Sequence, residues 1–469
     1  MIDGKTIEIA RQALRVLNPW WTADTAPEAR AGTYRRRLFG ALEAHFSGSS
    51  PQATLVVGLR RIGKTTLVKQ LLAAHVERLD LPPRNALYLD CQDSMLAGVA
   101  LSDLYDTYAR EQRSNAHPCI VAIDEVQYLE NWHLQLRDLV HRTQGAGVHI
   151  VATGSNPGEL RRASGRELLD RVRLFSLRTM SFGECLELEG RSIPKDAREA
   201  PEVFSSYEAY LFRGGFPALW TAALGPHESR SRVREICDRQ VVDGDIASRL
   251  GVRNPTGFRK LWAHLVTHPG EELSPGTLAQ GLSLGSEGIA RWLEALLQVE
   301  LAIEVIPTEK SGAALQGRKR HSRVFPADPA IASAYGVSME DGPGLETVVL
   351  RTLRELSAMV EPRDPAGSFV GFWKSSGGGK SRDIDFRWIA HEIDLPISVK
   401  GARSLQNDDV ARLASVAETL DAKRALLLYR GESRTHFEKK GVRVTAMPVL
   451  DFLLRAERFE GELDALLAD

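Results

Sequence analysis

A glycine-rich segment that ends in lysine and threonine constrains this chain more than any other feature. Gly58-Leu59-Arg60-Arg61-Ile62-Gly63-Lys64-Thr65 fits the pattern GxxxxGK[ST]. It follows the apolar run 54–57 and precedes a helical pattern with Leu67, Val68, Leu71 and Leu72 on one face. Strand, loop and helix in this order are the context that the motif requires. We therefore predict a phosphate-binding loop rather than an ordinary turn.

The loop supplies candidate ligands for a nucleotide. Its glycines let backbone N–H groups approach phosphates, and the N-terminus of the following helix adds positive potential. Lys64 would reach the β- and γ-phosphates, and Thr65 would ligate Mg²⁺. The predicted phosphate-binding set is Gly58, Arg61, Ile62, Gly63, Lys64, Thr65 and Thr66.

Two later strands end in polar residues. The apolar run 119–123 is followed by Asp124 and Glu125, and the run 150–154 by Ser155 and Asn156. Carboxylates at the carboxyl end of a strand fall where open α/β sheets bind ligands. We expect Asp124 to hold the Mg²⁺ water shell and Glu125 to polarise the attacking water, which favours a hydrolase over a kinase. Ser155 or Asn156 could sense the γ-phosphate or position the water.

Five short apolar runs alternate with amphipathic helical stretches between residues 53 and 180. They are 53–58, 86–91, 119–123, 149–153 and 172–177. Nearly continuous apolar runs suit strands that are buried on both faces. The alternation therefore predicts an α/β fold with a parallel five-stranded sheet covered by helices.

The N-terminal region and the composition give weaker constraints. A helix is predicted over 34–46, with Leu38, Leu42 and Phe46 on one face and the arginines 35–37 on a solvated face. The net charge of −1 excludes a globally basic nucleic-acid coat and a strongly acidic tail protein. No apolar run is long enough to cross a bilayer, and the first residues lack a secretory signal. The four cysteines form no CxxC motif, so we expect a cytoplasmic protein with reduced thiols.

Several motifs together resemble a large family of bacterial and archaeal ATP-binding proteins, which have an AAA-plus module and a C-terminal domain of unknown function. The resemblance covers about residues 35–435. It rests on the phosphate loop, the Asp-Glu strand and the polar-tipped strand in this order, and on further matching segments. These are Met180-Ser181-Phe182-Gly183-Glu184-Cys185-Leu186, Gly214-Gly215-Phe216-Pro217, Leu345-Glu346, Asp383-Ile384-Asp385-Phe386 and Ile397-Ser398-Val399-Lys400.

The resemblance implies that ATP and Mg²⁺ are the cofactors and that Lys64 and Glu125 are catalytic. It also implies an arginine finger that acts on the γ-phosphate of a neighbouring subunit. Arg171 stands at the family's arginine position, although Asp170 replaces the usual glycine and Arg166 and Arg173 lie nearby. Pro217 belongs to a motif similar to that of origin-recognition and STAND-type proteins, whose proline lies near the adenine. The alternative is a plain helix break.

The expected organisation has five parts. They are an N-terminal helical segment (1–50), an AAA-plus core (51–180), a helical lid (181–250), a winged-helix domain (251–330) and a C-terminal restriction-endonuclease-like α/β domain (331–469). In the winged helix, 277–282 would be the second helix and 286–298 the third, with Ile289, Leu293, Leu296 and Leu297 inward.

The winged-helix region offers two candidate contacts with DNA. The outward face of the third helix carries Glu287, Arg291 and Glu294, which is not basic enough for a strong DNA contact. The loop that follows offers more basic side chains for contact with DNA phosphates, namely Lys310, Arg318, Lys319, Arg320, His321 and Arg323. A regulatory or packing module is the alternative for this region.

The C-terminal segment carries three residues of a nuclease pattern, Glu346, Asp385 and Lys400. The nuclease pattern has Glu or Gln where this chain has Ser398, so one metal ligand is lost. Asp383, which lies on the same strand face as Asp385 by the period of two, could compensate. An inactive nuclease-like fold that contacts nucleic acid or protein is therefore expected, and the alternatives are an active nuclease and an unrelated α/β fold.

The sequence thus predicts a Mg²⁺-dependent ATPase that acts as a nucleotide-dependent switch on a nucleic-acid or protein partner and forms homo-oligomers, without a membrane contact. One alternative is an ATP-licensed DNA nuclease. The other is a slow switch that keeps ATP as a structural cofactor, for example in antiphage defence or a toxin–antitoxin pair.

Overall fold

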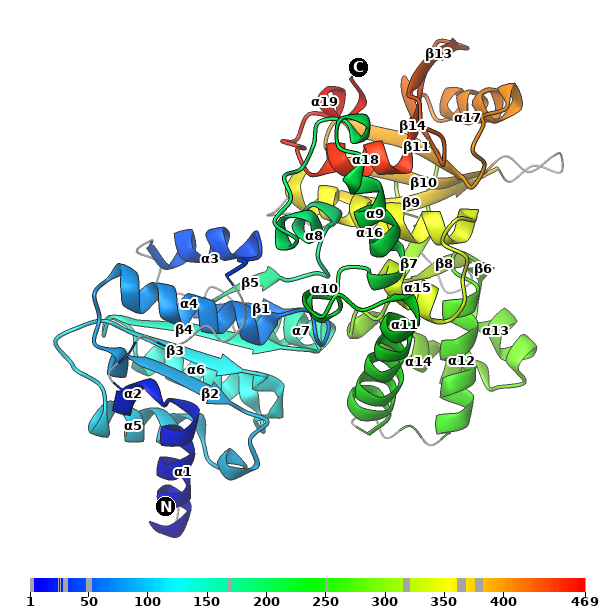
Figure 1. Ribbon diagram of the computed structural model, residues 1–469. Coiled ribbons are helices and arrows are strands. Elements are labelled where there is room, and N and C mark those ends of the chain that lie inside the picture. Colours follow the sequence, from blue (N-terminus) through cyan, green and yellow to red (C-terminus); the bar gives the residue numbers. More distant parts are fainter. Residues whose placement is uncertain are drawn as a thin grey trace. The chain divides into compact units, whose positions relative to one another are not determined.

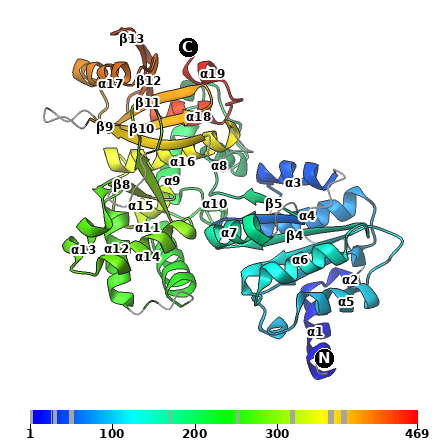
Figure 2. The same ribbon diagram turned by 180° about the vertical axis from the view of Figure 1, so that it is seen from behind.

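The computed structural model contains two compact units (Figures 1 and 2). Unit 1 comprises Met1–Arg178 with Gln298–Glu300, and unit 2 comprises Thr179–Leu297 with Leu301–Asp469. The structure describes residues 4–23, 25, 27, 33–47, 53–167, 171–248, 252, 254–314, 321–360, 368–375 and 383–468.

Unit 1 is built on a parallel sheet with the strand order β2-β3-β4-β1-β5. The strands are β1 (Ala53–Val57), β2 (Ala86–Asp90), β3 (Cys119–Asp124), β4 (Val148–Gly154) and β5 (Val172–Ser176). Each of the five runs predicted from the sequence forms one of these strands, which confirms the predicted sheet. The first four strands are almost entirely buried because helices cover both faces of the sheet.

Alternating strand residues face the two helical layers. One face packs on α4 (Lys64–Arg78), beside α3 (Leu38–Ser47). Residues of α1 (Gly4–Leu17), α5 (Leu101–Glu111), α6 (Trp132–Arg142) and α7 (Pro157–Glu167) share the core of the other face (Figure 1). The shorter elements are α2 (Trp20–Ala23), η1 (Pro83–Asn85), η2 (Ser94–Leu96) and η3 (Val126–Tyr128).

The segment before the sheet differs from its prediction. Helix α3 begins at Leu38, so the arginines 35–37 precede it and do not lie on its surface. Leu42 and Phe46 are buried as expected, but the third core residue is Phe39, while Leu38 is only half-buried. Arg36 is also buried, which contradicts the predicted solvated face.

Unit 2 begins with helices. They are α8 (Phe182–Leu188), η4 (Ala197–Glu199), α9 (Glu202–Arg213), α10 (Pro217–Thr221), α11 (Pro226–Arg234) and the π-helix η5 (Glu235–Ser248). Next come α12 (Pro255–Thr267), β6 (Glu272–Leu273), α13 (Pro275–Leu282), α14 (Ser286–Gln298), β7 (Ala302–Pro307) and β8 (Ser322–Pro326). Strand β8 pairs antiparallel with both β6 and β7.

The rest of unit 2 extends the same sheet. Its elements are α15 (Pro329–Ala334), α16 (Gly342–Val360), β9 (Ser368–Lys374), β10 (Asp383–Ala390), β11 (Ile393–Lys400), α17 (Asn407–Thr419), β12 (Arg424–Tyr429), β13 (Thr435–Lys439), β14 (Val442–Pro448), α18 (Val449–Ala456) and α19 (Leu463–Leu467). The predicted hairpin is confirmed as β9 and β10, and its glycine-rich turn lies outside the described residues. Because β7 pairs parallel with β9, the strands form one nine-stranded sheet in the order β13-β14-β12-β11-β10-β9-β7-β8-β6.

Helices pack on the strands β9–β14. Helix α17 packs on β12 and β14 through an apolar cluster that includes Val410, Leu413 and Leu427. Helix α16 packs on β9, β10 and β11, and it also contacts α18 (Figure 1). No helix of the described residues is long and apolar enough to cross a membrane.

Candidate nucleotide-binding site

The loop between β1 and α4 has a backbone that only certain residues allow. A side chain at Gly58 would place its Cβ 2.2 Å from the carbonyl oxygen of Leu177. Gly63, directly before α4, has φ of 98°, in the left-handed region that favours glycine. Arg61 also adopts a left-handed conformation, with φ of 65°. The motif glycines are therefore required by the shape of the loop itself.

Lys64 lies inside this loop. Its ammonium group donates hydrogen bonds to the carbonyl oxygens of Gly58 (3.1 Å) and Leu59 (3.0 Å). The same group lies 3.5 Å from Oε1 of Glu125. Burial lowers the pKa of Lys64, although the neighbouring carboxylates oppose that shift. A phosphate group in the loop would give this buried cation a better partner than two carbonyl oxygens.

Asp124 is buried at the end of β3 and accepts hydrogen bonds on both of its oxygens. Oδ2 accepts from the hydroxyls of Thr65 (2.6 Å) and Tyr88 (2.8 Å), and Oδ1 accepts from Thr153. The structure thus brings together the two predicted Mg²⁺ residues, Thr65 and Asp124. A hydroxyl beside a carboxylate is an oxygen donor set that suits Mg²⁺.

Glu125 is held by its backbone and by its neighbours. Its φ of 53° lies in the left-handed region, and its backbone N–H donates to Oγ1 of Thr153 (2.9 Å). The amide of Gln127 donates to its carboxylate and also to Oγ of Ser155 (2.9 Å). Burial alone would raise the pKa of Glu125, but Lys64, Gln127 and Ser155 outweigh it and lower the pKa. Glu125 is therefore ionised at neutral pH, as an acceptor of a proton from water must be.

The comparisons with known proteins agree with this geometry. The protein-family model described as "AAA domain" matches residues 50–186, and a "Domain of unknown function (DUF8612)" matches residues 205–341. Residues 50–186 are an AAA-plus P-loop ATPase domain. ATP hydrolysis is the reaction of that class.

Similar proteins were found by sequence. The uncharacterized protein MJ1637 of Methanocaldococcus jannaschii is 30% identical over 149 residues, which cover 31% of this chain and 30% of that protein. The chain thus matches less than a third of that relative's length. The uncharacterized protein Rv2008c of Mycobacterium tuberculosis is 23% identical over 432 residues, or 88% of this chain and 82% of that protein.

Two solved structures are distant matches to this chain. The Aeropyrum pernix ORC2 protein is 16% identical and covers 68% of this chain and 96% of its own, with a TM-score of 0.40. The A. pernix ORC1 protein in complex with DNA is 14% identical, and the match covers 68% of this chain and 95% of that protein, with a TM-score of 0.31. Likeness at this level supports no conclusion about function.

Several residues of the candidate site were not predicted. Tyr88 and Thr153 bind Asp124, and Gln127 joins Glu125 to Ser155. Arg36 donates to the carbonyl oxygens of Ile62 (3.0 Å) and Arg178 (2.9 Å), so it ties the segment before α3 to the loop. Thr153 does lie near the carboxyl end of a predicted strand, and this position could have identified it. Tyr88 lies in the middle of β2, where no local pattern marks it. No local pattern singles out Arg36.

Other predicted site residues lie elsewhere. Arg171 is exposed just before β5, whose first residue pairs with Ala53 at the start of β1. It therefore lies at the amino end of the sheet. The phosphate loop lies at the opposite end, about 13 Å away along the strand direction. The side chain of Arg166 lies outside the described residues, and Arg173 is exposed with its guanidinium 5.3 Å from the ring centroid of Phe175. Asn156 bonds to Glu159.

The Gly-Gly-Phe-Pro segment belongs to unit 2, where Pro217 begins α10. A Cβ at Gly214 would lie 1.7 Å from Oδ1 of Asp328, and one at Gly215 would lie 2.3 Å from the backbone of Met180. The N–H of Gly215 donates to Asp328 (3.0 Å). These glycines therefore serve close packing within unit 2, and a contact of Pro217 with adenine stays a prediction.

The Met-Ser-Phe-Gly-Glu segment also has a structural explanation in unit 2. Ser181 caps α8 in a reciprocal capping box with Glu184. Glu457 accepts from the Ser181 hydroxyl (3.0 Å) and from the Gly183 N–H (2.9 Å). The start of α8 is therefore attached to the residue that follows α18.

In unit 2, Glu346 of α16 and Asp385 of β10 line one cavity of about 560 Å³. Burial and the neighbouring Asp385 raise the pKa of Glu346 to about 8. Lys400 is close enough to oppose that shift. Oδ2 of Asp385 accepts from Ser398 (3.0 Å) and from the backbone of Val399 (2.7 Å). Two of the predicted residues therefore share a cavity, while Ser398 binds Asp385.

The predicted basic loop needs one correction. Arg323 is buried, and its guanidinium donates to the carbonyl oxygens of Ile384 (3.3 Å) and Asp385 (3.4 Å). Such a side chain does not offer a phosphate contact at the surface, so that part of the prediction was wrong. Lys310 is exposed and pairs with Asp421 (3.1 Å). Arg318, Lys319 and Arg320 lie outside the described residues.

Proposed function

We propose that this chain hydrolyses ATP with Mg²⁺ and uses the cycle as a switch on a macromolecular partner. The single observation that carries the proposal is the arrangement around Glu125. An ionised carboxylate, held by Thr153 and Gln127, lies beside Lys64 at the carboxyl end of β3, which β4 separates from β1 in the sheet of unit 1. Water activation needs a fixed base of this kind near the phosphates.

The residues present fit the two cofactors. Lys64 and the N–H groups of the loop would hold the phosphates of ATP. Thr65 and Asp124, whose oxygens are 2.6 Å apart, would hold Mg²⁺. When bound, Mg²⁺ would neutralise charge on the phosphates. Asp124 is already desolvated and hydrogen-bonded, so little side-chain motion would be needed.

A switch needs a link between the nucleotide and the rest of the domain. Gln127 donates to both Glu125 and Ser155, and Ser155 follows the end of β4. Loss of the γ-phosphate would change the charge beside Glu125, and Gln127 would transmit the change to Ser155. We therefore assign Ser155 to sensing, as the polar strand end suggested.

Nucleic acid is the partner that we favour. The order α12, β6, α13, α14, β7, β8, with β6 paired to β8, agrees with a winged helix. The exposed residues of α14 include Glu287, Arg291 and Glu294, so its face is not basic. We assign the phosphate contact to Lys310, Arg318, Lys319 and Arg320. Weak and salt-sensitive binding is expected because it rests on counterion release.

The partner can be tested by trapping. The Glu125→Gln chain should keep ATP bound. When this variant is purified in the presence of ATP, nucleic acid should copurify with it, and digestion with a nuclease should remove that nucleic acid. Lys64→Ala, which should not bind ATP, is the matched control. Equal retention by both variants would contradict a switch. Retention that does not change after Arg318, Lys319 and Arg320 are neutralised would contradict the assigned surface.

An ATP-licensed nuclease is the second candidate, and the shared cavity of Glu346 and Asp385 favours it. Ser398 argues against it, because its hydroxyl donates to Asp385 where the pattern wants a further acidic or amide ligand. We therefore expect no metal-dependent cleavage of duplex or single-stranded DNA, with or without ATP. Nicking that disappears in Asp385→Ala would establish the nuclease instead.

A further inference from the structure

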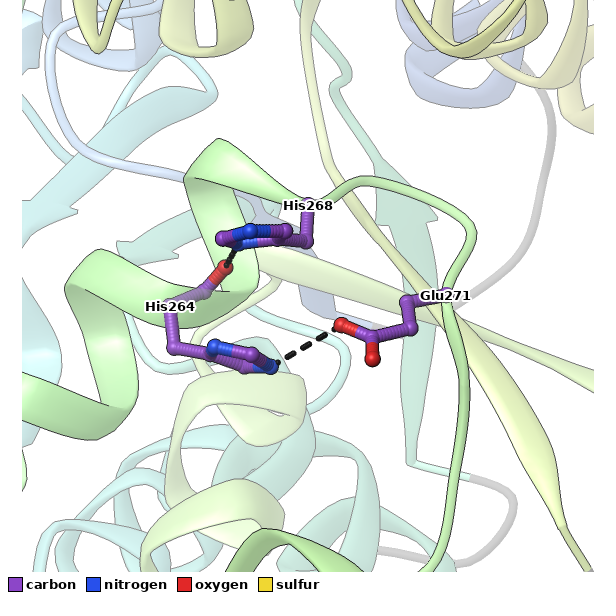
Figure 3. A group of neighbouring side chains, drawn as sticks. All are labelled: His264, His268 and Glu271. Atoms are coloured by element: carbon purple, nitrogen blue, oxygen red, sulfur yellow. Dashed lines mark hydrogen bonds and ion pairs between the residues drawn. The ribbon is translucent and has the colours of Figure 1, made fainter. Parts of the chain in front are cut away.

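A group of three metal-ligating side chains lies in unit 2, away from the nucleotide loop in the sequence (Figure 3). His264 lies in the last turn of α12, His268 is the residue directly after that helix, and Glu271 precedes β6. Their ligand atoms all lie within 4.8 Å of one another. The spacing of four between the histidines places both imidazoles on one side of the helix end.

The geometry of the group is well defined. The two imidazole rings are stacked, with centroids 4.6 Å apart and 21° between their planes. Nε2 of His264 lies 3.0 Å from Oε2 of Glu271. That nitrogen is buried and has no aligned hydrogen-bond partner among the described residues. Figure 3 shows the carboxylate of Glu271 facing His264.

The tautomer of His268 follows from its neighbours. Its Nδ1 lies 3.1 Å from the carbonyl oxygen of His264 and 3.0 Å from Oγ1 of Thr267. The Thr267 hydroxyl already donates to the carbonyl oxygen of Ala263 (2.7 Å). A carbonyl accepts only, so Nδ1 carries the proton and Nε2 keeps its lone pair. A backbone carbonyl on the far nitrogen is the usual partner that orients a metal-ligating histidine.

The surroundings favour a cation. Both histidines lie at the carboxyl end of α12, where unpaired carbonyl groups give negative potential. His268 and Glu271 also line the cavity of about 560 Å³. That cavity also carries the side chains of Asp341 and Asp385, against the guanidinium of Arg323. A divalent ion would therefore be attracted to this end of the cavity.

We propose that His264, His268 and Glu271 bind one divalent transition-metal ion of the zinc class. Two imidazoles and one carboxylate are a three-ligand set that leaves a position for water. Ligand atoms around a tetrahedral ion of this kind lie about 3.4 Å apart. Side-chain rotations would therefore have to bring these ligand atoms closer together than the 4.8 Å within which they now lie. Imidazole nitrogen suits zinc, nickel or cobalt and does not suit Mg²⁺, so the site is distinct from the Mg²⁺ site at Thr65 and Asp124.

The test uses the full chain, stripped of metal and free of any histidine tag. Co²⁺ is titrated and followed by visible absorption, and Zn²⁺ is followed by calorimetry. We expect each chain to bind one Co²⁺ and to show the visible absorption bands of Co²⁺ with imidazole ligands. Added Zn²⁺ should displace Co²⁺ and abolish these bands, whereas excess Mg²⁺ should not change them. His268→Ala and Glu271→Gln should each weaken Zn²⁺ binding by about tenfold or more.

Two controls keep the result clear. His227→Ala removes an exposed imidazole of α11 and should bind Zn²⁺ like the wild type. His268 and Glu271 are exposed, so their variants should unfold at the wild-type temperature. An absence of Zn²⁺ binding by the wild type would overturn the proposal. So would affinity that is unchanged in both His268→Ala and Glu271→Gln, since the metal would then be bound elsewhere.

Discussion

At the scale of single residues, the candidate site depends on groups that hold two carboxylates in fixed places. Thr153 binds both acids, since its hydroxyl donates to Asp124 and accepts from the backbone of Glu125. Gln127 then fixes the side chain of Glu125. A general base must be positioned within hydrogen-bonding reach of the water that it activates. The neighbours of the acids therefore matter as much as the acids themselves.

Gln127→Ala should slow ATP hydrolysis by about 10–100-fold. Without the Gln127 amide the Glu125 carboxylate would be misplaced, and misplacement of a catalytic group slows a reaction by about this factor. ATP affinity should change little, since Gln127 does not belong to the loop. The measurement is steady-state turnover together with calorimetric binding of ATP. Asn156→Ala is the matched control, because that amide bonds to Glu159 instead of Glu125. Equal losses in both variants would contradict a positioning role for Gln127.

Glu346 gives a pH-dependent prediction. Its pKa is raised to about 8 by burial and by Asp385. A folded-state pKa above the unfolded value means that stability is fully present at low pH and is lost as the pH rises through about 8. Glu346→Gln stays neutral, so it should unfold at a higher temperature than the wild type at pH 9 and at a similar temperature at pH 4. A difference that does not depend on pH would rule out this titration.

At the scale of elements, Arg36 links the segment before α3 to the phosphate loop. Its guanidinium binds the carbonyl oxygen of Ile62 in the loop and that of Arg178 after β5. Arginine can hold two chain segments at once because its donors point in fixed directions. The loop is thus supported from outside the strand–loop–helix unit.

Arg36→Met should lower the unfolding free energy of unit 1 by about 2–3 kcal/mol, since it leaves buried carbonyl groups without a charged donor. It should also weaken ATP binding, because the loop loses a support. Arg35→Met tests the neighbouring exposed arginine, whose guanidinium lies 4.4 Å from the ring centroid of Phe39. Thermal unfolding and ATP calorimetry measure both effects. A larger loss in Arg35→Met would show that the two carbonyl contacts are unimportant.

The elements also show what the sequence could predict. The five strands and the phosphate loop were predictable because continuous apolar runs and the GxxxxGK[ST] spacing are local patterns. The start of α3 was misplaced because Arg36 looks like a surface arginine until its distant carbonyl partners are known. The role of Glu457 was missed for the same reason, since it binds Ser181 across 276 residues of chain. Long-range polar contacts leave no periodic signal in a sequence.

At the scale of the whole molecule, the open question is how chains act on one another. Arg171 is exposed at the end of the sheet opposite to the phosphate loop. From there its side chain is too short to reach the phosphate loop of its own chain. If it serves as a finger, it must do so for a neighbouring copy of the chain.

Turnover per chain should therefore rise with protein concentration. Arg171→Ala should lower turnover strongly, as loss of an arginine finger can cost about 10³-fold or more. Mixing Arg171→Ala with Glu125→Gln should restore activity, because one chain supplies the base and the other the arginine. Arg173→Ala distinguishes the two exposed arginines near the start of β5. Turnover that does not depend on concentration in a confirmed monomer would contradict the arrangement.

The proposed ATPase rests on two roles, the binding of phosphates by Lys64 and the activation of water by Glu125. Calorimetric ATP binding and steady-state turnover should be measured together for the wild type, Lys64→Ala and Glu125→Gln. We expect that Lys64→Ala loses ATP binding, whereas Glu125→Gln binds ATP like the wild type and hydrolyses it at least about 100-fold more slowly. ATP affinity in Lys64→Ala equal to that of the wild type, or full turnover by Glu125→Gln, would contradict these roles.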